Sequence, residues 1–404
     1  MERTWVHAAA VGVTTALVGF TSSVAVLIAG LTAAGADADQ ASSGLLVLCV
    51  SVGLGTMVLS WRMRTPITLA WSTPGAALLA TQASLGWAAA VGAFLVTGFL
   101  IAAIGLWPWL GRLVASIPAP LAQAMLAGVL VPLCLRPVTE LAADPWPVAV
   151  VIVIWLALQR LALRWATPTA FAAALAVIAV QAGAGARGAL VPPTLDLTAP
   201  EITGAAVVGI ALPLTVVTMA SQNVPGIAVL ASAGFRVPWR ATMLVTGAGT
   251  ALGAAGGGHA VNLAAITAAL PASPDAARDP ERRWIAAFAA GCSYLVLAGA
   301  GATLVALSHA GTTDALAVVA GLALLPTLAS SLAGAFAAAE DRIPAAATFM
   351  LAASGATLAG IGSAFWALVG GLAIRTLLGS RTRSEHAGPG VGAEHPDPLS
   401  PSRS

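Results

Sequence analysis

The chain alternates between long apolar runs and short breaks that contain charged residues, proline or glycine. A run of about 20 apolar residues is long enough to cross a bilayer as a helix. The alternation predicts fourteen membrane spans, and therefore an all-α polytopic membrane protein. The approximate bounds are 7–33, 41–60, 65–82, 88–107, 117–135, 146–163, 168–183, 203–222, 239–255, 257–270, 284–307, 313–338, 343–360 and 361–378. The third and tenth runs are short and interrupted by polar residues, proline or glycine, which predicts that these two spans are broken.

Composition supports a membrane protein and excludes other classes. Hydrophobic residues make up 58% of the chain and charged residues 8%, with a mean hydropathy of +0.91. A soluble domain carries about 25% charged residues, so this chain could not cover a soluble surface. All 18 basic residues are arginine, and they are too dispersed for a nucleic-acid-binding surface. Cys49, Cys134 and Cys292 lack the spacing of a metal site or a disulfide framework.

The arginines predict the topology, because cytoplasmic loops carry an excess of positive charge. A cytoplasmic N-terminus assigns sixteen of the 18 arginines to inner loops and tails. Only Arg136 and Arg187 then lie outside. This asymmetry predicts an even number of spans with both termini in the cytoplasm. The first apolar run, Ala8–Leu31, is longer than the 7–15-residue core of a signal peptide and is interpreted as the first span.

The two halves of the chain share a weak internal repeat. Gly19–Gly35 aligns without gaps against Thr218–Gly234. Two further correspondences keep the same order: Trp71–Leu78 with His259–Ile266, and Ala122–Gly128 with Ala315–Gly321. Spans 1, 3 and 5 thus map onto spans 8, 10 and 12, which predicts an inverted repeat of seven plus seven spans. Such repeats are typical of secondary transporters, and coincidence among alanine-rich helices is the alternative.

Polar residues interrupt the eighth run at Ser221, Gln222 and Asn223, directly before Val224-Pro225-Gly226. Polar groups at membrane depth usually face a cavity or another helix. One interpretation is that the helix ends at the Pro-Gly pair and lines a binding site in mid-membrane. The other is a kinked helix held to its neighbour by interhelical hydrogen bonds.

The broken third and tenth spans predict two facing half-helices. Thr73-Pro74-Gly75 favours a helix start with free N–H groups. Gly256–Gly258 precede a second short helix that we expect to begin near His259–Asn262. If the positive ends of these helices converge, they form an anion site. The alternative is that glycine and proline occur here as they do in ordinary membrane helices.

The acidic residues lie in loops, in tails or near span ends, which favours an anionic substrate over a cation pathway. His259 is the histidine within a predicted broken span, and its ordinary pKa of about 6.5 suits a proton carrier. The alternative role is a hydrogen bond to a backbone carbonyl that holds the turn. The chain carries no Walker loop, GxSxG or HExxH motif, so it is predicted not to be an enzyme and to need no cofactor.

Several stretches together resemble the benzoate:proton symporter (BenE-type) family of bacterial inner-membrane transporters. They are Ala70–Leu79, Ala211–Leu214, Val217–Asn223, Pro225–Ala228, Asn262–Ala269 and Gly362–Trp366. The resemblance implies uptake of an aromatic carboxylate with a proton, and the fourteen-span fold of uracil permeases and of bicarbonate or sulfate carriers. Where uracil permeases carry carboxylates in spans 8 and 10, this chain has Gln222, Asn223, His259 and Asn262, which argues against a uracil-type proton mechanism.

In that fold a core domain moves against a gate domain. The implied core comprises 1–110 and 201–308, the implied gate 111–200 and 309–379, and 380–404 is interpreted as a disordered cytoplasmic tail. The gate domain can also form a homodimer in this fold, and the sequence leaves the oligomeric state open.

The sequence thus predicts a proton-coupled importer of benzoate or a similar aromatic acid. His259 is the candidate proton carrier. The predicted substrate-binding residues are Thr73, Gly75, Ser221, Gln222, Asn223, Asn262, Leu263, Trp71 and Phe20. Backbone N–H groups near Gly75 and Leu263 are expected to hold the carboxylate. Alternatives are another small anion or a nucleobase on the same fold, a passive channel, or co-binding of proton and carboxylate without a titrating side chain.

Overall fold

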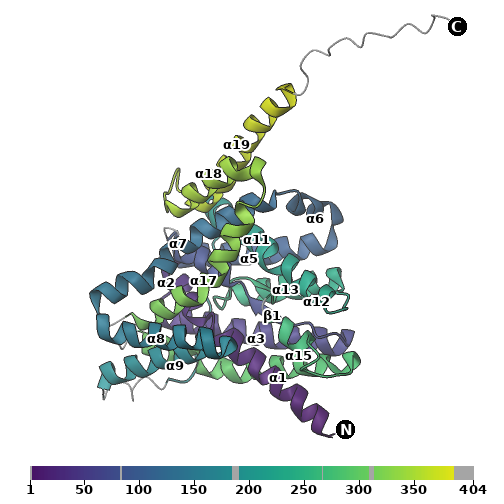
Figure 1. Ribbon diagram of the computed structural model, residues 1–404, viewed down its shortest axis with the longest axis vertical. Helices are drawn as coiled ribbons and strands as arrows, with labels where there is room; N and C mark the ends of the chain where they lie inside the picture. The colour runs from purple at the N-terminus through teal and green to yellow at the C-terminus, as the bar shows by residue number, and fades with distance from the viewer. Residues whose placement is uncertain (1, 82–83, 184–190, 266, 309–313, 386–404) are drawn as a thin grey trace, which may run out of the picture.

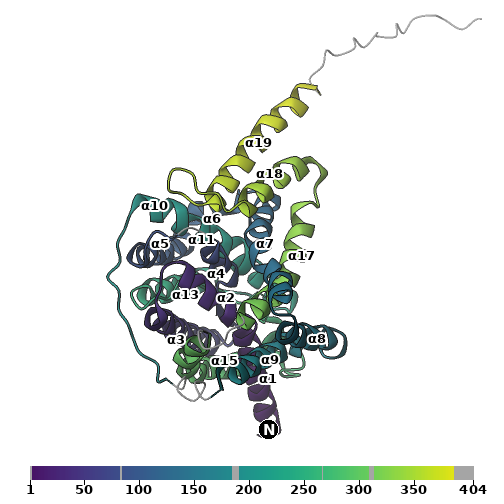
Figure 2. The ribbon, with the colours of Figure 1, turned by 90° about the vertical axis from the view of Figure 1, so that its left-hand side faces the viewer.

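The chain folds into a body of packed helices with one short two-stranded sheet inside it (Figures 1 and 2). The computed structural model describes residues 2–81, 84–183, 191–265, 267–308 and 314–385. Within these residues, eight helices are long and apolar enough to cross a membrane. Their bounds are Trp5–Ala33, Ala38–Met63, Trp87–Leu106, Ala119–Ala143, Leu163–Ala182, Gly204–Ser232, Pro280–Leu307 and Ala315–Ala335. The all-helical membrane class is therefore confirmed, and the number fourteen stays a prediction.

The first half of the chain contains nine helices and one strand among the described residues. They are α1 (Glu2–Thr21), α2 (Val24–Ala33), α3 (Ala38–Met63), β1 (Leu69–Trp71), α4 (Thr73–Ala80), α5 (Trp87–Leu106), α6 (Pro108–Ala115), α7 (Ala119–Ala143), α8 (Pro145–Leu161) and α9 (Leu163–Ala182). The candidate span Trp5–Ala33 comprises α1 and α2, which are separated by a turn at Ser22 and Ser23. The predicted third span is a strand followed by a short helix.

The second half repeats this order with more irregular helices. Its elements are α10 (Gly204–Ala206), the π-helical η2 (Val207–Ala211), α11 (Leu212–Thr218), the π-helical η3 (Met219–Asn223), α12 (Val224–Ser232), α13 (Trp239–Ala254), β2 (Val261–Leu263), α14 (Ala269–Ala272), the 3-10 helix η4 (Pro280–Arg282), α15 (Trp284–Leu297), the 3-10 helix η5 (Ala298–Ala300), α16 (Gly301–Ser308), α17 (Ala315–Ala335), the 3-10 helix η6 (Ala339–Asp341), α18 (Arg342–Ala353) and α19 (Ser363–Glu385). Helix α19 projects from the body in Figure 1 and continues to Glu385, into the segment predicted as a disordered tail. The rest of that segment, 386–404, lies outside the described residues.

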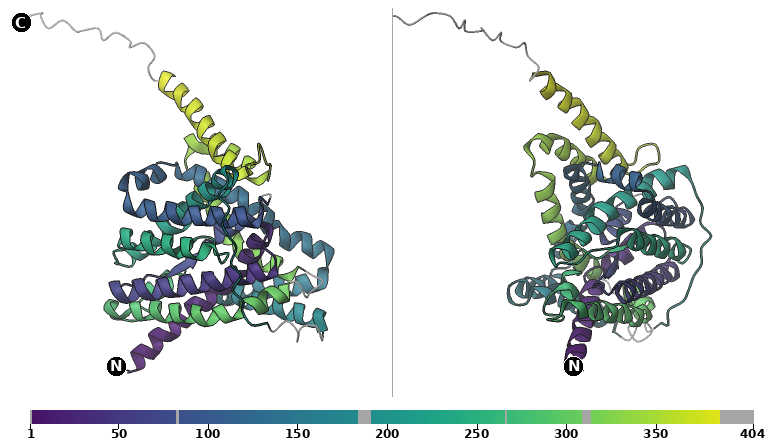
Figure 3. Two further views of the ribbon diagram at one scale, coloured as in Figure 1. Left: turned by 180° about the vertical axis from the view of Figure 1, so that it is seen from behind. Right: turned by 90° about the vertical axis from the view of Figure 1, so that its right-hand side faces the viewer.

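Helices of the first half pack directly against helices of the second half (Figure 3). Helix α5 of the first half packs on α13 of the second, and α3 of the first half packs on α15 of the second. In the predicted numbering these are contacts of span 4 with span 9 and of span 2 with span 11. The predicted repeat makes span 2 equivalent to span 9 and span 4 equivalent to span 11, so the two contacts are equivalent to each other. Gly98 and Gly247 allow the first contact, because a side chain at either would collide with the backbone of the facing helix. Small residues permit such close approach in membranes.

The strand pair lies at the centre of this arrangement. β1 and β2 are antiparallel, with Ala70 opposite Asn262. Two further bonds extend the ladder: Ser72 N–H donates to Ala260 O at 2.8 Å, and Ala264 N–H donates to Thr68 O at 3.0 Å. A twofold axis through the Ala70–Asn262 pair relates these two bonds. The axis places Trp71 in the position equivalent to Leu263, so the sequence alignment of Trp71 with His259 is wrong in register.

The prediction of a helix starting near His259–Asn262 is wrong. The chain is extended through β2, and the described helix after it, α14, has only four residues. Side chains from other helices hold the strand in place. Thr250 Oγ1 accepts from Val261 N–H at 2.9 Å, and Asn223 Oδ1 accepts from Leu263 N–H at 2.8 Å. These amides therefore need no helical partners.

The predicted helix end at Val224-Pro225-Gly226 is also wrong. The helix runs on from η3 into α12, with Pro225 in the first turn of α12. Proline clashes with the carbonyl four residues earlier in a regular α-helix, and the wider π turn of Met219–Asn223 precedes it here. The chain thus accommodates Pro225 by widening the helix instead of ending it.

Segment 191–203 crosses the outside of the body without regular structure and ends at the start of α10 (Figure 2). Hydrogen bonds fix it to the first half and to the end of α13. Asp196 N–H donates to Ser43 Oγ, Thr198 N–H to Ala255 O and Glu201 N–H to Ala88 O. This connection joins the two repeats.

Candidate functional site

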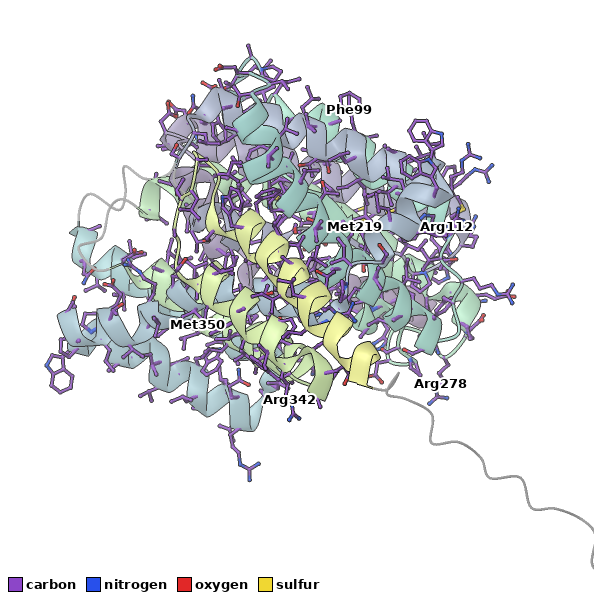
Figure 4. The ribbon with its side chains drawn as sticks, turned by 90° about the horizontal axis from the view of Figure 1, so that it is seen from above. Phe99, Arg112, Met219, Arg278, Arg342 and Met350 are labelled. Atoms are coloured by element: carbon purple, nitrogen blue, oxygen red, sulfur yellow. The ribbon has the colours of Figure 1, made fainter. Side chains whose placement is uncertain are left out.

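Three elements form the candidate site: the start of α4, which is joined to the others by hydrogen bonds of Ser72, the strand pair, and the π-helical segment η3. Met219, labelled in Figure 4, lies on η3 within the helical body. The strands are held from both halves in the same way. Thr56 Oγ1 of α3 accepts from Leu69 N–H at 2.9 Å, as Thr250 Oγ1 of α13 does from Val261 N–H. The twofold axis therefore extends from the strands to their supporting helices.

The start of α4 is built around Ser72. Its Oγ caps the helix by accepting from Gly75 N–H at 3.1 Å, as expected for serine ahead of Pro74 at the helix start. The same Oγ accepts from Thr218 Oγ1 at 2.8 Å, which ties α4 to the end of α11. The Gly75 amide, predicted to hold a carboxylate, is therefore engaged by a protein oxygen in this structure. A Cβ at Gly75 would meet the end of the Leu214 side chain, which would have to shift to accommodate it.

Asn223 ties η3 to β2. Its side chain is fully buried, and Oδ1 accepts from Leu263 N–H at 2.8 Å. The other amide atom, Nδ2, donates to Met219 Sδ at 3.1 Å, within the same π turn. The Leu263 amide, also predicted to hold a carboxylate, is thus engaged as well. The continuous helix of α11 and η3 thus contacts both halves of the site, through Thr218 to Ser72 and through Asn223 to Leu263.

His259 is fully buried and bridges the two broken spans. Its Nε2 lies 3.0 Å from Ser72 O. A carbonyl oxygen only accepts, so Nε2 carries a hydrogen and donates it. The other nitrogen, Nδ1, has no partner among the described residues. The structure therefore shows the carbonyl bond that was one of the two predicted roles, and it leaves one ring nitrogen available for a proton.

Asn262 is the most unusual polar group of the site. It is fully buried on β2, and neither Oδ1 nor Nδ2 has a hydrogen-bond partner in the described part of the chain. Buried amide atoms are nearly always bonded, and leaving one unbonded costs about 1–3 kcal/mol. A group that the protein leaves unpaired at this position suits a ligand or water.

Trp71 forms an aromatic cluster with Phe20 and Tyr294. Both rings meet Trp71 edge to face, with centroids 5.8 Å away. Trp71 Nε1 is buried without a partner in the described structure. The cluster brings together two of the predicted substrate-binding residues, Trp71 and Phe20, and Tyr294 is an addition that the sequence did not indicate.

The remaining predicted residues are less well placed. Ser221 Oγ donates to Val217 O within its own helix. Thr73, Ser221 and Gln222 are half-buried, so they border the site without lying in its centre. The sequence reasoning missed Ser72 and Thr218. Ser72 was detectable as a capping residue ahead of Pro74, whereas the partner of Thr218 depends on tertiary packing.

Two surface grooves lie away from this site. One, of about 730 Å³, is bordered by α1, α3 and α15, and the other, of about 420 Å³, by α5 and Trp107. Neither contains a predicted site residue. No group of three or more His, Cys, Asp or Glu side chains suitable for a metal occurs in the described ranges.

Comparison with known proteins assigns the chain to a family. Residues 3–377 match the family model described as benzoate membrane transport protein. The chain belongs to this family. It is 37% identical over 357 residues to the inner membrane protein YdcO of Escherichia coli, covering 88% of this chain and 91% of that protein. It is 28% identical over 390 residues to the benzoate membrane transport protein of Acinetobacter baylyi, covering 94% and 97%.

Two solved structures show the same fold. The transmembrane domain of the cyanobacterial bicarbonate transporter BicA matches with a TM-score of 0.57 at 15% identity, covering 94% of this chain and 98% of that domain. SLC26A9 matches with a TM-score of 0.65 at 12% identity, covering 92% of this chain and 65% of the other. The family and the fold together establish a membrane transporter built as an inverted repeat.

Proposed function

We propose that this chain is a secondary active transporter that imports benzoate or a similar small aromatic carboxylate with a proton across the bacterial inner membrane. Family membership and the name of the Acinetobacter relative support the substrate class. The single structural observation that carries the proposal is the unpaired, fully buried amide of Asn262 on the central strand pair.

The site suits an aromatic anion by its chemistry. Asn262 Nδ2 supplies a donor for a carboxylate. The cluster of Phe20 and Trp71 supplies aromatic surface for a ring. Gly75 and Leu263 contribute their amides only if the substrate displaces Ser72 Oγ or Asn223 Oδ1. Without substrate, these side-chain oxygens accept the hydrogen bonds that the carboxylate oxygens would accept.

Proton coupling has two candidate carriers. His259 can take a proton on Nδ1 while Nε2 keeps its bond to Ser72 O. The carboxylate can also carry the proton itself. Transport would follow from movement of the proposed core, 1–110 and 201–308, against the proposed gate, 111–200 and 309–379, with both termini in the cytoplasm. The packing of α7 on α17 joins the two gate segments across the repeat.

Uptake of labelled benzoate into proteoliposomes under an imposed pH gradient tests the proposal. We expect accumulation above the outside concentration that a protonophore abolishes. Equilibration without accumulation would indicate a passive channel. Uptake of a different anion or a nucleobase that excess benzoate does not inhibit would assign another substrate. Absence of benzoate uptake under every gradient would overturn the proposal.

A further inference from the structure

The groove of about 730 Å³ lies on the outer face of the body, where α1, α3 and α15 run side by side (Figure 3). Its lining is almost entirely apolar and includes Val13, Trp61, Phe288 and Val296. Val296 is 79% exposed and Trp61 is 56% exposed. In a membrane protein such a surface faces lipid hydrocarbon instead of water.

One end of the groove carries the features of a membrane interface. Three tryptophans line it: Trp5 near the start of α1, Trp61 near the end of α3, and Trp284 at the start of α15. Tryptophan is enriched at the level of lipid headgroups. The groove therefore runs from the membrane interface toward the hydrocarbon region. A phospholipid has the same order, with its headgroup at the interface and its acyl chains in the hydrocarbon.

A positive charge is fixed at the same end. The Arg64 guanidinium lies over the Trp284 ring, with Cζ 4.3 Å from the ring centre. Arg64 also occupies the left-handed C-terminal position of α3, with φ of 51°, where glycine is the usual residue. The backbone thus carries a large side chain at a position that disfavours one.

No carboxylate of the described residues forms a salt bridge with the Arg64 guanidinium. Asp275, Asp279 and Glu281 are exposed on the segment before α15, and Asp279 pairs with Arg282 at 3.3 Å. Arg62 is exposed on the last turn of α3 and adds positive charge.

We propose that this groove binds one anionic phospholipid, with an acyl chain along Val13, Phe288 and Val296 and the headgroup phosphate on Arg64. The planar guanidinium matches phosphate geometry and can bond it with two N–H groups. Stacking on Trp284 orders the guanidinium at the groove mouth before the lipid arrives. The inference rests on the membrane fold and is independent of the transported substrate.

Cys292 provides the probe. It is exposed and lines the groove, whereas Cys49 and Cys134 are buried, so a thiol-reactive bimane will label Cys292 selectively. The labelled protein is placed in phosphatidylcholine nanodiscs that contain a small fraction of brominated phosphatidylglycerol or brominated phosphatidylcholine. Bromine on the acyl chain quenches the probe on contact. We expect that half of the fluorescence is quenched at a several-fold lower fraction of brominated phosphatidylglycerol than of brominated phosphatidylcholine.

Two variants locate the headgroup. Arg64→Gln should remove the difference between the lipids, while Arg160→Gln, an exposed arginine near the end of α8, should keep it. Equal quenching by both lipids in the unmodified sequence would overturn the proposal, as would a preference that survives Arg64→Gln. Loss of the preference with excess glycerol phosphate would mean a site for free phosphate instead of lipid. Lack of quenching by either lipid would mean that a protein surface covers the groove.

Discussion

The side-chain oxygen of Asn223 accepts a hydrogen bond from Leu263 N–H at 2.8 Å, which joins the π turn η3 to the strand β2. The two residues are 40 positions apart and both are fully buried. A helix that only crossed the membrane would not need this bond. The bond between Asn223 and Leu263 stabilises an extended strand within the membrane protein, where an unbonded backbone amide is costly.

Replacing Asn223 with alanine should destabilise the protein. The Leu263 N–H would lose its acceptor in a fully buried position, and such a loss costs about 1–3 kcal/mol. Thermal unfolding in detergent should show a lower midpoint. Ser232→Ala is the control, because its exposed hydroxyl bonds only within its own helix and the change should stay within about 0.5 kcal/mol. An unchanged midpoint for Asn223→Ala would mean that water replaces the amide oxygen.

Replacing Asn262 with leucine should weaken benzoate binding without lowering the stability of the protein. Neither side-chain polar atom is bonded to a described residue, so a similar apolar shape should leave stability unchanged or raise it. Benzoate binding should weaken by about tenfold or more, because a hydrogen bond to a charged group contributes about 1.5–3 kcal/mol. Calorimetric titration measures the affinity, and a thermal melt measures stability on the same sample.

Thr348→Val is the matched control for Asn262→Leu. Thr348 is fully buried in α18, and its hydroxyl bonds to Pro344 O of the same helix. This variant should bind benzoate normally. Normal benzoate affinity in Asn262→Leu would remove Asn262 from the binding site and leave it a buried polar group that water satisfies.

Ser72 and Thr218 should be energetically coupled. Ser72→Ala removes the cap of α4, which costs about 1 kcal/mol, and Thr218→Val removes the donor to the same oxygen. Because the two hydroxyls share one bond, the double variant should lose less stability than the sum of the single variants. Unfolding free energies of all four proteins measure the coupling. Ser72→Ala combined with Thr348→Val should be additive within about 0.5 kcal/mol.

Much of the membrane architecture follows from local sequence. Apolar run lengths indicate the long apolar helices, and Thr73-Pro74-Gly75 indicates the start of a short helix. The strand at Val261–Leu263 could not be predicted in this way, because its amides bond to Thr250 and Asn223 on other helices. The repeat register failed for a related reason. Alanine-rich segments align almost equally well in several registers, and only the pairing of Ala70 with Asn262 selects one.

Residue type predicted the burial of the candidate site residues better than it predicted their hydrogen-bond partners. Polar residues at membrane depth identified Asn223, Asn262 and His259, which are all fully buried around the strand pair. The amides of Gly75 and Leu263 were expected to be free, and side-chain oxygens occupy them instead. Such occupancy depends on packing between halves, which no local pattern encodes.

Replacing His259 with glutamine should separate proton coupling from structure. The glutamine amide can still donate to Ser72 O, so the bridge between the broken spans is kept, but the titratable Nδ1 is lost. The melting midpoint and the benzoate affinity should stay near those of the unmodified protein. Accumulation of benzoate in proteoliposomes should no longer follow the imposed pH gradient.

His7→Gln is the matched control, because His7 Nε2 also lies against a backbone carbonyl, that of Asp275, but on the exposed part of α1. This variant should keep the dependence of accumulation on the pH gradient. If His259→Gln keeps it too, the proton travels with the carboxylate and His259 acts only as a bridge to Ser72. If His259→Gln instead loses benzoate binding together with stability, the imidazole is required for packing against Phe94, whose ring centre lies 6.3 Å away.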